Sequence, residues 1–403
     1  MRAFKIALPI LALLLVVAGG LALRIHVVGI PHYPRTGVPD LHVEVTPERV
    51  ARGKRWAQML CADCHGNPSS GRLTGADMHL DDPFGNIHSL NITRHPERGI
   101  GAWSDGDIAY ILRTGVARDG RYTPPWMAKL VHLSDEDLFS IIAFLRSDDP
   151  MVAPSDIANV PSHPSFFAKF LAHVAFKPYP YPERPIVEPA AGDAVGRGRY
   201  LTYNLDCWTC HSPDFSKVNP LDPPTTPGFL SGGNLIDNAA GERLASPNLT
   251  PDAETGIGRW SEADFVRALR EGVRPDSTAV RAPMSTYSLL TDDEAHAIFT
   301  YLRSVPAIRH PVARTPSPVV TPETAAGKRA YLRYACYSCH GHEGLGNCDL
   351  TRNREHWPAD ADLAAFIRDP PRRLPGSRMP AWRNIIPDDE LAALIAHLRT
   401  LAR

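Results

Sequence analysis

One five-residue pattern, Cys-x-x-Cys-His, occurs three times in this chain of 403 residues. Two thiols three residues apart can each add across a vinyl group of one haem, and the histidine that follows can ligate the iron. With 7 cysteines and 17 histidines in the sequence, chance would give roughly 0.005 copies of this pattern. The copies are Cys61-Ala-Asp-Cys64-His65, Cys207-Trp-Thr-Cys210-His211 and Cys336-Tyr-Ser-Cys339-His340. The sequence therefore predicts three covalently attached haem c groups, with His65, His211 and His340 as iron ligands.

Other uses of paired cysteines fit the pattern less well. A zinc site would need pairs to combine into four-ligand sets, and a thioredoxin-like redox pair needs no histidine after it. The motifs use six of the seven cysteines. We expect the seventh, Cys348, to be a small packed residue, because no partner thiol remains for it.

The second iron ligand of each site is expected to be a methionine, because a thioether fills the sixth position and raises the reduction potential. An internal repeat selects the candidates. Asn91-Ile-Thr and the Gly-Ile-Gly-x-Trp-Ser stretch that ends at Ser104 recur 157 residues later, and the same offset carries Met127 onto Met284. Met379 is the only methionine after Met284 and is the candidate for the third site. The rivals in the first site are Met78, His79, His88 and His95.

Helix signals surround each motif, so we expect an all-α fold of three tandem modules. Thr46-Pro-Glu and Thr321-Pro-Glu are capped helix starts ahead of the first and third motifs, and Ser104 followed by Asp107 is typical of a capping box. The 39 prolines gather between modules, where they act as stiff linkers. The predicted segments are an N-terminal segment (1–29), module one (45–149), a linker (150–190), module two (191–304), a linker (305–321) and module three (322–403).

The third module is expected to be a shorter variant. It lacks the Asn-x-Thr and Gly-x-Gly-x-Trp block of the other two. Aromatic residues of the closing helices, Phe144 and Tyr301, are expected to pack on the helix that carries the motif. The equivalent position of module three is His397, a departure that the sequence does not explain.

The N-terminus is either a secretory signal or an anchor helix. A short basic head precedes eighteen residues without a charge, from Ile6 to Leu23. The possible cleavage sites are poor, and we favour a retained membrane anchor with the basic end in the cytoplasm. In both cases the chain from about residue 30 onward is exported. A second apolar segment, Phe166 to Phe176 in the first linker, could lie on a membrane or dock onto a partner. We favour packing against the two adjacent modules.

The chain resembles the membrane-associated triheme cytochrome c subunits of bacterial dehydrogenase complexes, which serve alcohol, gluconate or sorbitol dehydrogenases. The shared marks, over residues 45 to 403, are the three motifs, the doubled Asn-Ile/Leu-Thr and Gly-Ile-Gly-x-Trp-Ser blocks, and a shorter third module. The resemblance implies class I cytochrome c modules and electron delivery to ubiquinone or a terminal oxidase. It also implies the axial pairs His65 with Met127, His211 with Met284, and His340 with Met379.

These observations predict a periplasmic electron carrier without catalytic residues. It would take single electrons from a periplasmic dehydrogenase and deliver them to the inner membrane, to the quinone pool or a terminal oxidase. The formal net charge of −1 gives no support for binding to nucleic acid. Two alternatives remain open. One is a haem enzyme, a peroxidase or thiosulfate-type oxidoreductase with one open iron, and the other is an oxidase-facing carrier without a dedicated dehydrogenase.

Overall fold

The computed structural model divides the chain into two compact units. Unit 1 consists of Met1–Trp56 and Leu73–Ile186, and unit 2 of Ala57–Arg72 and Val187–Arg403. The described residues are 2–67, 70–78, 84–237, 242–281, 283–315, 317, 319–334, 336–341, 344, 349–374, 377, 379, 381–383 and 385–401, with only the backbone described for 2–9, 338 and 339. His79, Cys348 and the side chain of Cys339 therefore lie outside the described part of the chain.

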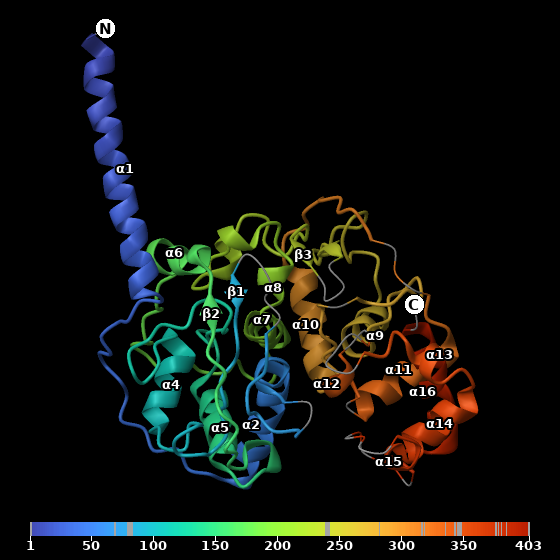
Figure 1. Cartoon of the computed structure of the whole chain (residues 1–403). Coiled ribbons are helices and arrows are strands. Elements are labelled where there is room, and N and C mark those ends of the chain that lie inside the picture. The colour runs from blue at the N-terminus through green and yellow to red at the C-terminus, as the bar shows by residue number, and fades with distance from the viewer. Residues whose placement is uncertain are drawn as a thin grey trace. The chain divides into compact units, whose positions relative to one another are not determined.

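Unit 1 contains the long N-terminal helix and most of the first predicted module (Figure 1). Its elements are α1 (Arg2–Val28), most of α2 (Pro47–Leu60), β1 (Gly85–Asn86), α4 (Asp105–Thr114), α5 (Asp135–Arg146), η1 (Pro150–Val152), β2 (His163–Pro164) and α6 (Phe166–Val174). The two short strands pair antiparallel, with Gly85 opposite Pro164.

Unit 2 begins at the end of α2 with the first Cys-x-x-Cys-His motif and resumes at Val187. Its elements are α3 (Ala62–His65), α7 (Ala194–Asn204), α8 (Cys207–Cys210), η2 (Phe215–Lys217), η3 (Pro223–Thr225), β3 (Leu235–Asp237), β4 (Arg243–Ala245), α9 (Glu262–Glu271), α10 (Asp292–Ser304), α11 (Pro322–Arg333), α12 (Tyr337–His340), α13 (Asn353–His356), α14 (Asp360–Arg368), α15 (Pro370–Arg373) and α16 (Asp388–Leu401). The chain is helix-rich, at 44% helix, as the all-α prediction requires. Its division into three modules stays a prediction.

The predicted capping box at Ser104 is confirmed, and its repeat is built the same way. The Ser104 hydroxyl accepts from the Asp107 N–H at 3.0 Å, while the Asp107 carboxylate accepts from the Ser104 N–H at 2.9 Å. Ser261 and Asp264 form the same reciprocal pair at the start of α9. These bonds satisfy N–H groups that have no partner inside the helix. They explain why α4 and α9 begin where they do.

A glycine lets the helix before each motif touch the backbone of a later helix. A Cβ at Gly53 in α2 would lie 1.8 Å from the carbonyl oxygen of Ser140 in α5. At Gly198 in α7 it would lie 1.8 Å from the Ala297 oxygen in α10, and at Gly327 in α11 it would lie 1.9 Å from the Ala393 oxygen in α16. Such distances admit no side chain, so glycine sets the separation of all three helix pairs.

The closing helices place a ring beside each of these crossings. Phe144 is fully buried in α5, and Tyr301 in α10 meets the Tyr203 ring of α7 edge-on at 6.2 Å. His397 occupies the corresponding place in α16 and meets the Tyr331 ring of α11 edge-on at 5.4 Å. The unexplained histidine is therefore a packed core ring. Among the described atoms its Nε2 has no hydrogen-bond partner.

The repeated Asn-x-Thr sequences are turns that fix the loop after the motif. The Asn91 side-chain oxygen accepts from both the N–H and the hydroxyl of Thr93, and Asn248 does the same with Thr250. Module three lacks the Asn-x-Thr sequence, as noted from the sequence, but it contains the same turn. Asp349 accepts from the N–H of Thr351 at 2.7 Å and from its hydroxyl at 2.6 Å. A carboxylate oxygen replaces the amide oxygen, so the same geometry arises from Asp-Leu-Thr.

The two apolar segments differ from the rest of the chain in their exposure. In α1, Ile10–Val28 is long and apolar enough to cross a membrane, and 6% of that stretch is buried. In α6, Ala168 and Ala172 are buried, but Phe166, Phe167 and Phe170 are exposed. The expected packing is confirmed in part for Phe167, whose ring lies 6.0 Å from the Phe84 ring of module one, but all three phenylalanines are exposed.

Replacing Gly198 by alanine should lower the free energy of unfolding by about 3 kcal/mol, because α7 and α10 must move apart to admit the Cβ. Denaturant unfolding of the holoprotein, followed by circular dichroism, measures the loss. Gly192→Ala is the matched control, since a Cβ there meets nothing within 4 Å. Equal stabilities of the two variants would contradict the close crossing.

The buried ring of His397, whose Nε2 has no hydrogen-bond partner among the described atoms, should make the free energy of unfolding depend on pH. Burial lowers the pKa of His397 to about 3, whereas in the unfolded chain the pKa is about 6.5. The unfolded state therefore binds more protons below about pH 6.5, and the free energy of unfolding should fall by about 1.4 kcal/mol for each pH unit down to the folded pKa.

His397→Phe should remove this part of the pH dependence, while the exposed His356→Gln variant should retain it. Denaturant titrations of both variants at neutral and mildly acidic pH compare the slopes. An unchanged slope in His397→Phe would show that other groups cause the acid sensitivity.

Candidate haem-attachment sites

Each Cys-x-x-Cys-His motif forms one short turn of helix, α3, α8 or α12. In all three the histidine N–H donates to the carbonyl of the first cysteine, which closes the turn. The bonds join His65 to Cys61 (2.8 Å), His211 to Cys207 (2.9 Å) and His340 to Cys336 (3.0 Å). Residues three apart lie on the same side of a helix, so the turn brings both thiols of a motif to one side.

The second motif shows how the ligand histidine is oriented. His211 is buried, and its Nδ1 lies 2.8 Å from the carbonyl oxygen of Pro247. A carbonyl only accepts, so Nδ1 carries the proton and Nε2 presents its lone pair. Burial also lowers the pKa of His211, which keeps the ring neutral. A neutral imidazole held through its other nitrogen is the form that ligates iron.

The two thiols of the second motif are free and desolvated. Cys207 and Cys210 are free thiols, and desolvation by the surrounding protein raises their pKa values to about 12 and about 11. Cys210 is nevertheless an exposed residue. Protein atoms around it desolvate the thiol without covering the residue. Desolvation likewise raises the pKa of Cys61 to about 12. The accessible thiol pair beside an oriented imidazole fits the covalent attachment of a haem c.

Two of the predicted methionine ligands lie in equivalent turns. The Met127 N–H donates to the Pro124 carbonyl at 3.1 Å, and the Met284 N–H donates to the Arg281 carbonyl at 3.1 Å. The repeat that selected these residues therefore extends to the backbone. The Met379 N–H donates instead to the Ser377 hydroxyl.

Residues beside two of the three predicted pairs share surroundings, and the pairings themselves stay predictions. In unit 2 the Tyr287 hydroxyl, three residues after Met284, donates to the Leu205 carbonyl ahead of α8. Burial and then the charges of Cys207 and Cys210 raise the pKa of Tyr287. Met379 and Cys336 pack against one apolar core that includes Tyr331. His65 belongs to unit 2 and Met127 to unit 1, so their pairing stays a prediction.

Asp63, inside the first motif, acts on the surroundings of the other two. Its carboxylate accepts from the Ser285 hydroxyl at 3.2 Å, next to Met284. After burial, its charge also raises the pKa values of Tyr287 and of Tyr337, which lies inside the third motif. All of these residues belong to unit 2. The three attachment turns are therefore within electrostatic reach of one carboxylate.

Sequence reasoning missed two groups that position ligands. One is the Pro247 carbonyl, which lies 36 residues after His211 and carries no side-chain signal. The other is Lys129, whose ammonium donates to the carbonyls of Pro124 and Met127 at 2.7 and 2.8 Å. Burial lowers the pKa of Lys129 to about 7. The repeat could not have revealed it, because the equivalent residue 157 positions later is Thr286.

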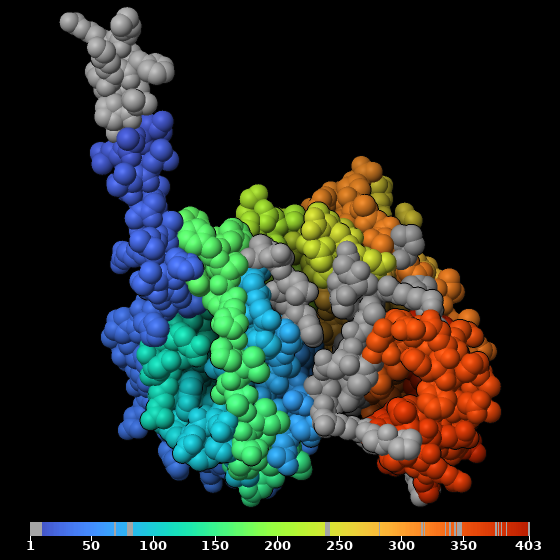
Figure 2. Space-filling model, in the orientation of Figure 1, coloured from blue at the N-terminus to red at the C-terminus, as the bar shows by residue number. Residues whose placement is uncertain are grey.

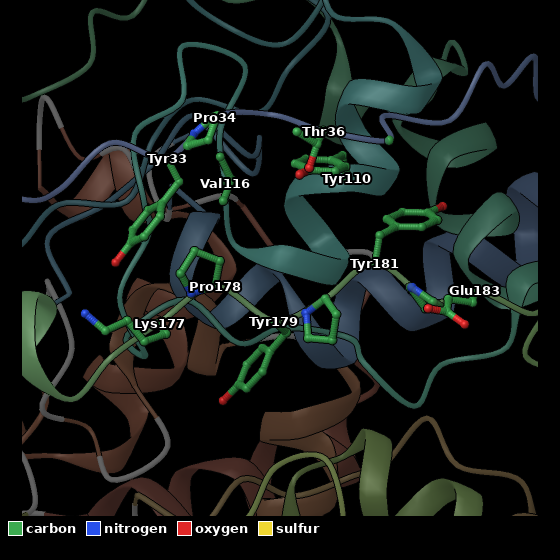
Figure 3. Close-up of a pocket in the computed structure, with 13 residues that line it drawn as sticks. Tyr33, Pro34, Thr36, Tyr110, Val116, Lys177, Pro178, Tyr179, Tyr181 and Glu183 are labelled. Carbon is green, nitrogen blue, oxygen red and sulfur yellow. The ribbon is translucent and has the colours of Figure 1, made fainter.

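A separate cavity of about 740 Å³ lies in unit 1, away from the haem ligands. It is lined by Tyr33, Pro34, Thr36, Gly37, Tyr110, Val116 and residues 177–183 (Figure 3). The Tyr110 and Tyr181 rings stack at 5.9 Å beside it. None of these lining residues is a cysteine, histidine or methionine, so the cavity is not an attachment site.

Comparisons with known proteins match the stretches around the second and third motifs to cytochrome c families. The model of the family described as cytochrome c matches residues 195–306, and that of "Cytochrome C oxidase, cbb3-type, subunit III" matches residues 322–398. The cytochrome c subunit of the quinone alcohol dehydrogenase of Gluconobacter oxydans is 31% identical, over 87% of this chain and 78% of its own length.

Two further relatives carry related names. The fructose dehydrogenase cytochrome subunit of Gluconobacter japonicus is 30% identical, over 72% of this chain, and the gluconate 2-dehydrogenase cytochrome c subunit of Pantoea cypripedii is 33% identical, over 61% of it. This chain spans only 63% and 57% of the lengths of those two relatives. The match to the alcohol dehydrogenase subunit extends over most of both chains. The chain thus belongs to the family of cytochrome c subunits of quinone-linked dehydrogenases, electron-transfer proteins that bind haem c covalently.

Proposed function

We propose that this chain binds three haem c groups and carries single electrons from a dehydrogenase on the periplasmic side to the membrane respiratory chain. A quinone or a terminal oxidase accepts the electrons there. The observation that carries the proposal is the threefold recurrence of one motif, closed each time by the same histidine-to-cysteine backbone bond. A haem c in such a motif supplies one-electron exchange between ferric and ferrous iron.

The assignment of ligands follows from the turns. We propose that His65 pairs with Met127, His211 with Met284, and His340 with Met379. The cysteines of the motifs, including Cys64, Cys210 and Cys339, form the thioether bonds. The Pro247 carbonyl orients His211, and the turn from Arg281 to Met284 would hold the methionine that supplies the second ligand. Filling both axial positions leaves no room for substrate chemistry.

The placement of the motifs supports transfer from one site to the next. All three attachment turns belong to unit 2, and Asp63 acts on residues beside the other two. Electron tunnelling weakens steeply with distance, so attachment points within electrostatic reach favour rapid exchange. The charge of Asp63 also favours the ferric state at each site that it reaches.

The proposed location follows from α1. Its apolar stretch, Ile10–Val28, is exposed and long enough to span a bilayer. The basic residues before it favour a cytoplasmic N-terminus and place the motifs on the outer side of the membrane. The relatives named as subunits of alcohol, fructose and gluconate dehydrogenases support a dehydrogenase as the electron donor.

A haem count and a carbon monoxide test separate this carrier from a haem enzyme with an open iron. We expect three haems for each chain, and no change in the visible spectrum of the reduced protein when carbon monoxide is added, because methionine closes every sixth position. The pyridine haemochrome assay and a difference spectrum measure these two quantities. A spectral change equivalent to one haem would favour the enzyme, and a count of two would remove one motif from the proposal.

Met284→Leu should open one site and identify its ligand. We expect carbon monoxide to alter the spectrum of one haem in three, and the reduction potential of that haem to fall, because the thioether that raised it is lost. The matched control is Met151→Leu, a methionine in η1 that is not a proposed ligand. A variant that stays closed to carbon monoxide at all sites would refute Met284 as a ligand.

A further inference from the structure

The helix α6 presents an apolar stripe to its surroundings. Phe166, Phe167, Phe170 and Val174 are 46%, 46%, 37% and 53% exposed. At 100° per residue these four side chains fall within an arc of about 100° of the helix, whereas the buried Ala168 and Ala172 lie on the opposite side. The helix therefore packs onto unit 1 mainly through its small residues. Its large apolar residues are exposed, although the Phe167 ring also lies 6.0 Å from the Phe84 ring.

Unit 1 holds this helix firmly. The Ser165 hydroxyl caps it by accepting from the Ala168 N–H at 3.1 Å, and the Ser165 N–H donates to the Phe84 carbonyl at 2.8 Å. The preceding strand β2 pairs with β1. At the other end, His173 Nε2 lies 3.0 Å from the Gly29 carbonyl oxygen. The exposed stripe thus belongs to an anchored element with a fixed orientation.

Contacts place α6 beside the C-terminal end of α1. The two helices pack together, and the His173 bond is made to the residue that follows the last residue of α1. Figure 1 shows α6 beside the lower end of α1, and in the space-filling view the α6 segment forms surface next to it (Figure 2). Ile25 is the first buried side chain of α1 after a run of exposed residues. At Ile25, α1 begins to pack against the rest of unit 1.

The length of α1 then determines the height of α6 relative to the bilayer. The uncharged stretch Ile6–Leu23 has 18 residues, about 27 Å of helix, close to the hydrocarbon thickness of about 30 Å. With that stretch in the bilayer, the charged Arg24 marks the outer boundary, and Gly29 lies about 9 Å beyond Leu23, at the level of the lipid headgroups. The helix α6 is bonded to Gly29. We propose that α6 is an interfacial helix that inserts Phe166, Phe167, Phe170 and Val174 into the outer face of the same bilayer. This rests on the retained anchor proposed above.

The neighbourhood favours lipid over a protein partner. The stripe lies on a helix that packs against α1, whose side chains from Ile10 to Val17 are apolar and exposed and, with α1 as the proposed anchor, face lipid. Aromatic side chains are enriched at the membrane–water boundary, and helices that lie there have an apolar face and cationic residues beside it. Lys169 lies on the flank of α6, and the exposed Lys177 follows the helix, with its ammonium donating to the His173 carbonyl. Both can reach phosphate groups.

Photo-crosslinking from the stripe tests the proposal. p-Benzoylphenylalanine replaces Phe167 in the full-length holoprotein, which is reconstituted into vesicles of phosphatidylethanolamine and phosphatidylglycerol and irradiated. Mass spectrometry then identifies the adducts. The control carries the same residue at Val45, which belongs to unit 1 and is 47% exposed. We expect lipid adducts at position 167 and their loss at position 45.

The same experiment applied to native membranes excludes a protein occupant. Three outcomes would overturn the proposal. Position 167 could form adducts with a polypeptide in place of lipid, it could form no lipid adduct, or the control position could form lipid adducts to the same extent. The intact mass of the mature chain tests the anchor separately. A mass that lacks α1 refutes the anchor, and the adducts at position 167 then still decide whether α6 meets lipid.

Discussion

The backbone contact between the helix before each motif and a later closing helix is the constraint on which this structure depends. At Gly53, Gly198 and Gly327 the helices approach until no Cβ fits. Each glycine lies two or three turns before the first cysteine of its motif, so the crossing fixes where the motif emerges from its helix. The rings beside the crossings, such as Tyr301 and His397, fill the space around that contact. Packing density, rather than any single polar bond, therefore determines the position of the chemistry.

Local rules in the sequence predicted the parts of this structure that depend on neighbouring residues. The capping box at Ser104 and the equivalence of Met127 with Met284 follow from a short spacing and from a constant offset. The long-range features were not predictable in this way. The Pro247 carbonyl that orients His211, and the Asp63 carboxylate that reaches Ser285, have partners set by the tertiary fold. The turn at Asp349 was missed because a carboxylate replaced an amide with the same acceptor geometry.

The outward-facing phenylalanines of α6 show a further limit of sequence patterns. Helical spacing indicates that Phe166 and Phe170 share a face, but it does not say what covers that face. Here the helix packs mainly through the small residues Ala168 and Ala172, and the large residues are exposed. A soluble surface rarely keeps several large apolar side chains together. The size of the side chains on each face is therefore as informative as their periodicity.

The junction at Gly29 has a mechanical consequence. The helix α1 continues to Val28, Gly29 turns with a φ of +71°, and the chain beyond is bonded at once to the body through Pro31 and Tyr33. No flexible linker separates α1 from the rest of unit 1, so the connection between the two cannot lengthen. A cytochrome on a flexible linker samples many heights above a membrane. Its rate of reaction with a membrane partner then depends on how often the cytochrome approaches that partner. With α1 as the proposed anchor, the search of unit 1 is reduced to movement within the plane of the bilayer and rotation about the axis of α1.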